Sequence, residues 1–288
     1  MDAKLRLSLV LPAFNEAAVI GHAVAEAEAA LRETFADFEV LVVDDGSSDD
    51  TAARVERLLP VSPHTRLLRH PHNRGYGAAL RTGFEAASFD LVAFTDADCQ
   101  FDLTDLGKLA PLAADFPVVA GYRVDRKDVW RRRFFSWGYN RLARTLLGTR
   151  VRDCDCALKV FRRAALAHLL PQSRGFFVNA EMLTRARQFG LGITEVPVTH
   201  RPRLGGASKV SIREIPKTAK TLLAFWWKNV VRGETPVLPA TAAAPPGWRR
   251  DAAHATPPRP TPALTPGPRP SSAPGLRAAP RGRRRAGA

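Results

Sequence analysis

The sequence predicts an α/β fold, a mostly parallel sheet flanked by helices, and three observations lead to it. Short apolar, β-branched runs alternate with stretches of helical periodicity through the first half of the 288-residue chain. Polar residues follow several of these runs directly. With 45% hydrophobic residues, the chain can also bury a sizeable core. We therefore expect parallel strands whose carboxyl ends carry a ligand site.

The expected elements follow one another in strand–helix order. Their periodicity predicts strands at residues 5–11, 39–43, 65–69, 91–95 and 118–121, separated by helices at residues 16–33, 49–59, 77–87 and 103–113. Beyond residue 123 the pattern changes, and it predicts a basic, aromatic helix over 130–147, a strand over 158–161 and a helix over 179–189.

A further amphipathic helix is predicted over residues 211–232. Its apolar stripe, at three- and four-residue spacing, consists of Ile212, Ile215, Ala219, Leu222, Leu223, Trp226 and Val230. Ser211 and Glu214 have the spacing of a capping box, and Pro216 implies either a kink or the first helical residue. Two interpretations of the stripe stay open. It either packs on the domain or lies in a membrane interface, for which the adjacent tryptophans are suited.

Composition sets apart the residues from 233 to 288. They include 13 of the 23 prolines and nine arginines, and they contribute +7 of the formal net charge of +15. With few large apolar residues, this stretch cannot offset the entropy cost of ordering, so we expect a disordered basic tail. The predicted division is a catalytic domain at 1–210, an interfacial helix at 211–232 and the tail. Basic charge suits nucleic acid, anionic lipid or phosphorylated substrates alike.

The cysteines and the N-terminus bear on the compartment. Cys99, Cys154 and Cys156 are few and odd in number, which favours a reducing compartment over a disulfide framework. Cys154 and Cys156 lack the second pair that a zinc site of this type needs. The first apolar run is too short for a signal peptide, and no stretch reaches the roughly 20 apolar residues that span a bilayer. We expect a cytoplasmic protein, peripheral on the cytoplasmic face of the membrane.

Acidic residues follow two of the expected strands. Asp96 and Asp98 come after the strand at 91–95, and their spacing directs both carboxylates to one side, where they can hold a hard divalent cation beside a diphosphate. Such a cation stabilises the charge of a diphosphate leaving group. Asp44 and Asp45 end the strand at 39–43. We expect Asp44 to accept hydrogen bonds from a base or ribose, and Asp45 to shape the turn.

Four ordered segments carry a family resemblance: LPAFNEAAVI, VLVVDDGSSDDT, HNRGYGAALRTGF and FTDADCQFD. Together they resemble the nucleotide-binding half of family-2 glycosyltransferases with the GT-A fold, and in particular the subgroup that makes dolichyl or polyprenyl phosphate mannose and glucose. Further similarity at GYR, CALKVFRR and THRPRLGGASKV extends the resemblance over residues 5 to about 210. The tail has no counterpart.

The resemblance implies inverting transfer of a hexose from GDP-mannose or UDP-glucose to a polyprenyl phosphate. It implies nucleotide binding by Pro12, Phe14, Glu16, Val42, Asp44 and Asp96. It implies Mg²⁺ or Mn²⁺ binding by Asp96, Asp98 and Gln100. Phosphates of donor and acceptor would be held by Arg123, Arg132, Ser136, Arg203 and Lys209. The catalytic set would then be Asp96, Asp98, Arg123, Arg203 and Lys209.

Three features of the sequence bear on this assignment. Arginine forks match phosphate oxygens, and Lys209 lies in a glycine-containing loop that can close over them. Phe14 stands where tyrosine is common in the family, so the ring remains and its hydroxyl contact does not. The segment 153–159 replaces a stretch that often contains glycine, which bears on the preference for sugar or acceptor.

Two alternative functions stay open. The same fold could act on a hydroxyl acceptor, with Glu181 as general base, whereas a phosphate acceptor is already an anion and needs no strong base. A basic, non-catalytic nucleic-acid or membrane-binding protein is the other alternative, against which the Asp96, Asp98 and Gln100 set argues. No nucleic acid is expected as a partner, and a separate membrane protein could be one. His200 could reach the metal, although a structural role is commoner for such a histidine.

Overall fold

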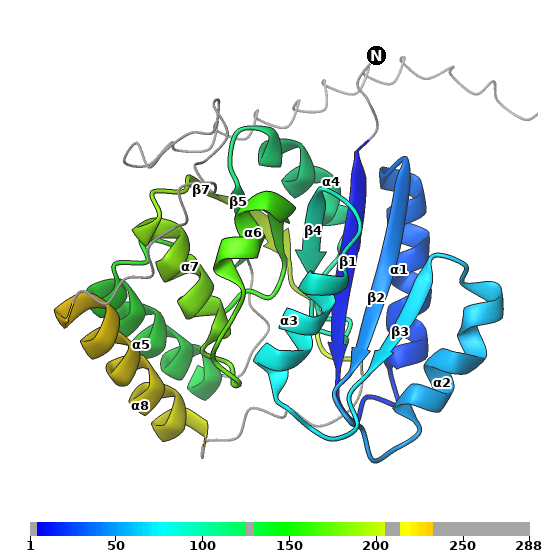
Figure 1. The fold of residues 1–288 in the computed structure, drawn as a ribbon, viewed down its shortest axis with the longest axis horizontal. Coiled ribbons are helices and arrows are strands. Elements are labelled where there is room, and N and C mark those ends of the chain that lie inside the picture. Colours follow the sequence, from blue (N-terminus) through cyan, green and yellow to red (C-terminus); the bar gives the residue numbers. More distant parts are fainter. Residues whose placement is uncertain (1–4, 125–129, 205–213, 233–288) are drawn as a thin grey trace, which may run out of the picture. The chain divides into compact units, whose positions relative to one another are not determined.

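A seven-stranded sheet forms the centre of the fold in this computed structural model, which describes residues 5–124, 130–204 and 214–232. The strands are β1 (Arg6–Ala13), β2 (Asp37–Asp44), β3 (Thr65–Arg69), β4 (Leu91–Phe94), β5 (Val118–Val124), β6 (Lys159–Arg162) and β7 (Ile193–Thr199). Their order across the sheet is β3–β2–β1–β4–β6–β5–β7 (Figure 1). Among these described strands, β6 runs opposite to the other six. The α/β prediction with a mostly parallel sheet is confirmed.

The helices are close to those expected, with one addition, α6. They are α1 (Ile20–Thr34), α2 (Thr51–Leu58), α3 (Tyr76–Ala86), α4 (Leu106–Leu109), α5 (Trp130–Leu147), α6 (Arg163–Leu169), α7 (Val178–Gln188) and α8 (Glu214–Trp226), which a π-helical turn continues over Trp227–Val231. The sequence did not predict α6 or β7. The single helix expected at 103–113 is a short α4 between two 3₁₀ segments, since Pro111 removes a backbone donor there.

Helices cover both faces of the sheet. Gly83 of α3 lies so close to β1 that an added Cβ would collide with Val10. The next residue of that strand, Leu11, shares a small pocket with Ala23 of α1. Successive strand residues point to opposite faces, so α3 and α1 lie on opposite faces (Figure 1). This explains why β1, β2 and β4 are buried almost throughout, as expected for parallel strands covered on both sides.

Helices α5, α7 and α8 gather at the side of the sheet where β5 and β7 lie (Figure 1). Leu222 of α8 has no exposed surface, and the ring of Phe225 meets Phe177 edge to face at 5.2 Å. Part of the predicted stripe therefore packs on the domain. Leu223 and Val230, which the same stripe included, are 49% and 46% exposed.

The described part of α8 bears on the predicted role of Pro216. Glu214 and Ile215 are already helical, so Pro216 is not the first helical residue. Ser211 and Ile212 lie outside the described residues, as do Lys209 and the predicted tail. None of the described helices is both long and apolar enough to cross a bilayer.

Candidate active site

The carboxyl ends of β1, β2 and β4 meet at one edge of the sheet. Ala13 of β1 pairs with Asp44 of β2, and the Thr95 amide that follows β4 donates to the Val10 carbonyl over 3.1 Å. The loops that begin at residues 14, 45 and 95 therefore start side by side. In open sheets of this kind the ligand site lies beyond such strand ends.

Hydrogen bonds join the loops after β1 and β2. The Asn15 amide donates to Ser47 Oγ over 2.9 Å, and Asn15 Oδ1 accepts from the Ser48 amide over 2.8 Å. The Glu16 amide donates to Thr51 Oγ1 over 2.8 Å. Phe14 and Glu16, two predicted nucleotide ligands, are thereby held half-buried at the edge of the site.

Asp44 and Asp45 have different partners. Buried Asp44 accepts from the Ser47 amide over 3.2 Å and lies 3.8 Å from the exposed Arg69 guanidinium. Asp45 accepts from the amides of Arg74 and Gly75 over 2.9 and 2.8 Å, and its Oδ1 lies 2.6 Å from His70 Nδ1. Asp45 therefore fixes the loop that leads into α3, an extension of its predicted role in the turn.

The two aspartates after β4 differ in their contacts. Asp98, only 4% exposed, accepts from Arg203 Nη2 over 2.7 Å. Asp96 accepts from the hydroxyl of Tyr76 over 2.8 Å. Burial, and next the charge of Asp98, raises the pKa of Asp96 to about 6. The carboxylates of Asp96 and Asp98 repel each other, and the positive charge of Arg203 offsets part of this repulsion. Carboxylates in this arrangement fit a hard divalent cation.

Gln100 connects this loop to the segment after β7. Its side-chain amide donates to the Arg201 carbonyl over 3.4 Å, and its own carbonyl accepts from the Arg201 amide over 2.7 Å. The Arg201 guanidinium contacts Glu26 on α1 at 2.6 Å and Asp102 at 2.5 Å. The segment that carries Arg203 is thus held both by α1 and by residues 95–102, the loop after β4, which we call the aspartate loop.

Arg123, at the end of β5, makes a forked ion pair with Asp153. Its Nε and Nη2 donate to the two carboxylate oxygens over 2.6 and 2.8 Å, and both side chains are less than 10% exposed. Burial alone would lower the pKa of Arg123, but the Asp153 carboxylate outweighs that effect and raises it above its ordinary value. A phosphate at Arg123 would share the guanidinium with Asp153.

Nothing in the sequence pattern indicates that Tyr76 contacts Asp96 in the aspartate loop. Tyr76 is the first residue of α3, and its ring lies 5.5 Å from that of Phe176. The next residue must be glycine, because a Cβ at Gly77 would collide with the Ser173 carbonyl. In the sequence, Tyr76 only precedes the helix predicted at 77–87, and the closeness of this turn to residues 173–176 comes from the fold.

Glu181 holds the loop that packs on Tyr76. It is 1% exposed and accepts from the amides of Gln172 and Ser173 over 2.9 and 2.8 Å. Its carboxylate also pairs with Arg185 at 2.9 Å. Both Glu181 oxygens accept from structural donors in this arrangement, which disfavours Glu181 as a general base.

The remaining predicted residues are placed as follows. Asp96, Asp98 and Arg203 lie together, and Arg123 is near enough to lower the pKa of Asp96 against the larger effect of burial. Pro12 is buried in β1, and Val42 has no exposed surface, so the side chain of Val42 is closed to a ligand in this arrangement. Arg132 and Ser136 belong to α5, but their side chains, like Lys209, lie outside what the structure describes.

His200, Cys154 and Cys156 take structural positions. His200 forms an isolated bridge with Phe101, and the two rings meet edge to face at 5.5 Å. Cys99, Cys154 and Cys156 are buried free thiols. Burial is the main cause that raises the pKa of the Cys154 and Cys156 thiols, so neither is poised as a reactive thiolate.

Comparison with known proteins shows which family the sequence matches. Residues 8–170 match the family model described as glycosyl transferase family 2. Glycosyltransferase AglD of Haloferax volcanii is 34% identical over 242 residues, which cover 80% of this chain and 38% of that protein. Undecaprenyl-phosphate 4-deoxy-4-formamido-L-arabinose transferase of Sodalis glossinidius is 33% identical over 214 residues, covering 73% of this chain and 64% of that protein. The chain thus spans less than two thirds of each relative.

Solved structures show the same fold. Glucosyl-3-phosphoglycerate synthase from Mycobacterium tuberculosis, in complex with Mn²⁺, uridine-diphosphate and phosphoglyceric acid, superposes with a TM-score of 0.62 at 24% identity and covers 81% of this chain and 80% of its own. The same synthase with Mg²⁺ and uridine-diphosphate has a TM-score of 0.59 at 22% identity, and it too covers 81% of each chain. At this identity the similarity concerns the fold, and it confirms the GT-A prediction.

Proposed function

The chain belongs to glycosyl transferase family 2, and we propose that it transfers a hexose from a nucleotide diphosphate sugar to a polyprenyl phosphate, with inversion at the anomeric carbon. GDP-mannose and UDP-glucose are the proposed donors. The observation that carries this proposal is the grouping of Asp96, Asp98 and Arg203 beyond the carboxyl ends of the parallel strands. Such a group can hold a divalent ion, a diphosphate and an anionic acceptor at one place.

The proposed donor site extends over the strand ends. Phe14, Glu16 and Asp44, close to the ends of β1 and β2, are the proposed ligands of the base and ribose. Asp96 and Asp98, with Gln100 beside them, would hold Mg²⁺ or Mn²⁺, and a bound ion would neutralise the charge of the departing nucleoside diphosphate. Arg123, Arg132, Ser136 and Lys209 are the further proposed phosphate ligands.

The proposed chemistry is a single displacement. An oxygen of the acceptor phosphate attacks the anomeric carbon as the bond from that carbon to the diphosphate oxygen breaks. Arg203 would move from Asp98 to the phosphates, so that one guanidinium orients the acceptor and stabilises charge as it develops. No general base is needed, because the acceptor is already an anion.

Two observations favour a lipid phosphate over a hydroxyl acceptor. The Sodalis relative is by name an undecaprenyl-phosphate transferase. Glu181, the candidate base for a hydroxyl acceptor, is engaged with Gln172, Ser173 and Arg185. Phosphoglyceric acid, the ligand of the structural relative, supplies a useful alternative acceptor for the test.

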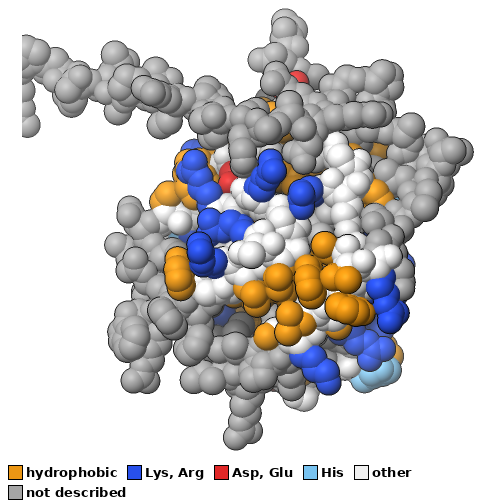
Figure 2. Space-filling model, turned by 90° about the vertical axis from the view of Figure 1, so that its left-hand side faces the viewer, with side chains coloured by type: hydrophobic (Ala, Val, Ile, Leu, Met, Phe, Trp, Pro, Cys, Tyr) orange, Lys and Arg blue, Asp and Glu red, His pale blue; other side chains and the backbone are white. Residues whose placement is uncertain are grey.

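A lipid acceptor requires contact with a membrane, and we propose that the α5–α8 face provides it on the cytoplasmic side. Figure 2 views the molecule from the side of α5 and α8, where apolar side chains gather with Lys and Arg around them. The exposed large apolar residues of these elements are Trp137, Leu142, Leu223, Trp227, Val230 and Val231. Among the side chains of these elements that the structure describes, the exposed basic ones are Arg141, Arg144, Lys220 and Lys228, and the exposed Arg232 follows directly. Apolar side chains with surrounding cations suit an anionic leaflet.

The decisive experiment offers a choice of donors and acceptors. Purified full-length protein with Mg²⁺ or Mn²⁺ is incubated with a panel of nucleotide sugars and with a short polyprenyl phosphate, the corresponding polyprenol, or phosphoglyceric acid. We expect a glycolipid only with the lipid phosphate, and none after chelation. Product from the polyprenol or phosphoglyceric acid but not from the lipid phosphate would overturn the acceptor assignment.

A further inference from the structure

A second cluster of metal-ligating side chains lies behind the aspartate loop. His22 and Glu26 are four residues apart on α1 and therefore share a helix face, with His22 Nε2 3.9 Å from Glu26 Oε2. Cys99 comes from the loop after β4. One ligand atom of each of the three residues lies within 4.8 Å of the other two.

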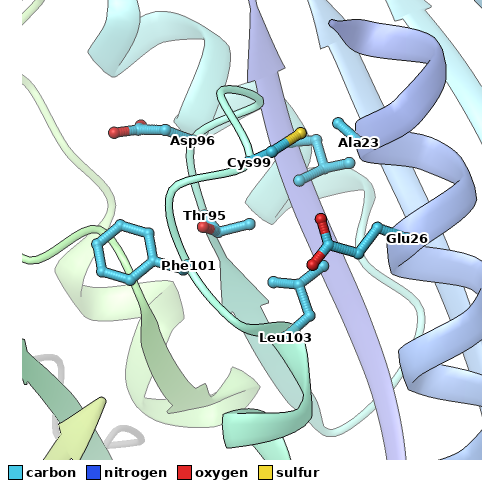
Figure 3. Close-up of a pocket in the computed structure, with 8 residues that line it drawn as sticks. Ala23, Glu26, Thr95, Asp96, Cys99, Phe101 and Leu103 are labelled. Carbon is cyan, nitrogen blue, oxygen red and sulfur yellow. The ribbon is translucent and has the colours of Figure 1, made fainter. Parts of the chain in front are cut away.

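The backbone of the loop directs the thiol toward α1. Cys99 has a positive φ of 58°, which is uncommon for a residue other than glycine. Figure 3 shows Glu26 and Cys99 at the same small pocket, one from the helix and one from the loop. His22 is exposed and can adjust its rotamer, whereas Cys99 is 6% exposed and held by its loop. The group therefore has one adjustable ligand and a fixed thiol.

Glu26 is prepared to act as a ligand through one of its two oxygens. Its Oε1 accepts from Arg201 Nη1 over 2.6 Å, whereas Oε2 is the atom on the side of His22. An ion could bind Oε2 without displacing Arg201. The arginine would then orient the ligand carboxylate, in the way that outer partners orient the ligands of known metal sites.

We propose that His22, Glu26 and Cys99 form a zinc site distinct from the Asp96–Asp98 site. Imidazole, carboxylate and thiolate are the ligands that Zn²⁺ takes in proteins, with water as a fourth, whereas Mg²⁺ prefers oxygen alone. The ligand atoms of a tetrahedral zinc site are about 3.5 Å apart. Binding would therefore draw together the three atoms, which now lie within 4.8 Å of one another, and the exposed His22 is the side chain with most room to move. On binding, the Cys99 thiol loses its proton to solvent and its sulfur donates an electron pair to the ion.

Zinc at this site should hinder transfer. Cys99 lies between Asp98 and Gln100, and Arg201 is two residues from Arg203. An ion bound to Cys99 and Glu26 would fix the aspartate loop and the Arg201 segment in the arrangement described, in which Arg203 pairs with Asp98. This consequence rests on the proposed transferase function, whereas the binding site itself does not.

The binding test uses Co²⁺ as a spectroscopic substitute for zinc, with the full chain and excess Mg²⁺ present to occupy the aspartate site. We expect a near-ultraviolet cobalt–thiolate band that Zn²⁺ removes. Cys99→Ser should abolish the band. His22→Gln should weaken Co²⁺ binding at least about ten-fold, since even loss of an outer-shell partner typically costs that much. His72→Gln, at another exposed histidine, is the matched control.

The outcomes decide between the alternatives. A band that survives Cys99→Ser, or equal Co²⁺ affinity in the His22→Gln protein, would overturn the site. If Cys99→Ser does not fold, His22→Gln still decides, because its side chain is exposed. In a transfer assay, Zn²⁺ should inhibit the native protein and spare His22→Gln. Lack of transfer with every donor would count against the proposed function and leave the cobalt test intact.

Discussion

Asp98 illustrates how single residues balance the charge of the candidate site. Its carboxylate pairs with Arg203 at 2.7 Å, so a guanidinium lies beside the oxygens proposed to hold the metal ion. Asp98→Asn keeps the shape and removes the charge. We expect transfer to fall by about 100-fold or more, the cost of losing a preorganised charged group in a partly dry site.

The control for this substitution is Asp90→Asn, which changes an exposed aspartate that pairs with Arg163 at 3.5 Å. That variant should transfer at the native rate, because surface ion pairs contribute little. Circular dichroism and thermal unfolding would establish that both variants fold. Native transfer rates in the Asp98→Asn protein would refute the metal assignment.

Tyr76 is expected to tune the affinity of the site for its ion. Its hydroxyl donates to Asp96 and stabilises the ionised carboxylate, against the burial that raises the pKa of Asp96. Tyr76→Phe removes that donor, so metal binding should weaken about ten-fold, as for a hydrogen bond to a charged group. Mn²⁺ titration followed by electron paramagnetic resonance measures this directly. Tyr122→Phe is the control, and an unchanged affinity in Tyr76→Phe would show that the hydroxyl does not position the ligand.

Substitution of Glu181 should affect the stability of the fold and not the transfer reaction. Glu181→Gln loses the buried charge that pairs with Arg185 and one of the acceptors for the 172–173 amides, so it should lower the free energy of unfolding by roughly 1–3 kcal/mol. Transfer to a lipid phosphate, normalised to folded protein, should stay within a few-fold of native. A loss of turnover with unchanged stability would instead restore the general-base role.

Among single residues, those whose role depends on local spacing can be predicted from the sequence. Asp96 and Asp98 are recognisable because two acids follow a strand at a two-residue interval. The partners of those and other site residues are not recognisable, because they come from remote segments. Tyr76 donates a hydrogen bond to Asp96, Arg203 to Asp98 and Arg123 to Asp153, and only the folded chain brings these pairs together.

Among the elements, those with clear periodicity were predicted and those with interrupted patterns were not. The helix at 130–147 was predicted at its observed bounds. β7 contains Pro197, which breaks the usual strand signal, yet the strand lies at the end of the sheet, where a missing donor is tolerated. α6 is seven residues long and follows β6 directly, too short for a helical period to stand out.

The exposed face of α8 gives a test of membrane contact. Leu222 of α8 packs inward, whereas Trp227 and Val230, in the π-helical turn that continues α8, are 52% and 46% exposed. Val230 belongs to the predicted stripe and Trp227 does not, so the exposed surface coincides with the stripe only in part. Replacing Trp227 and Val230 by serine should reduce flotation with anionic liposomes several-fold, because apolar burial and headgroup contact are lost. Flotation of the native protein should also weaken with salt.

Val61→Ser provides the matched control, since Val61 is 75% exposed but belongs to the 3₁₀ turn after α2. It should float as the native protein does. Equal flotation of the Trp227 and Val230 double variant would show that α8 is not the contact, and a separate membrane protein would then be the partner to seek.

For the molecule as a whole, the raised pKa of Asp96 predicts how stability depends on pH. The folded protein protonates Asp96 near pH 6, whereas the unfolded chain does so near the ordinary value of about 4. Between these values the folded state binds the extra proton, so without metal this group adds stability as the pH falls from about 6 to about 4. Burial is the largest cause of the shift and repulsion from Asp98 the second. A bound divalent ion would offset both effects, because its positive charge stabilises the ionised carboxylate.

Metal and proton should therefore compete for the same carboxylate. Thermal unfolding at pH 7.5 and pH 5, each with and without Mn²⁺, would measure this competition. We expect Mn²⁺ to raise Tm at the higher pH, because a ligand that binds only the folded state stabilises it, and to lose most of that effect at the lower pH. Asp96→Asn, which cannot ionise, should show little Mn²⁺ stabilisation at either pH. If Mn²⁺ raises Tm equally at both pH values in the native protein, the ion is not bound by Asp96.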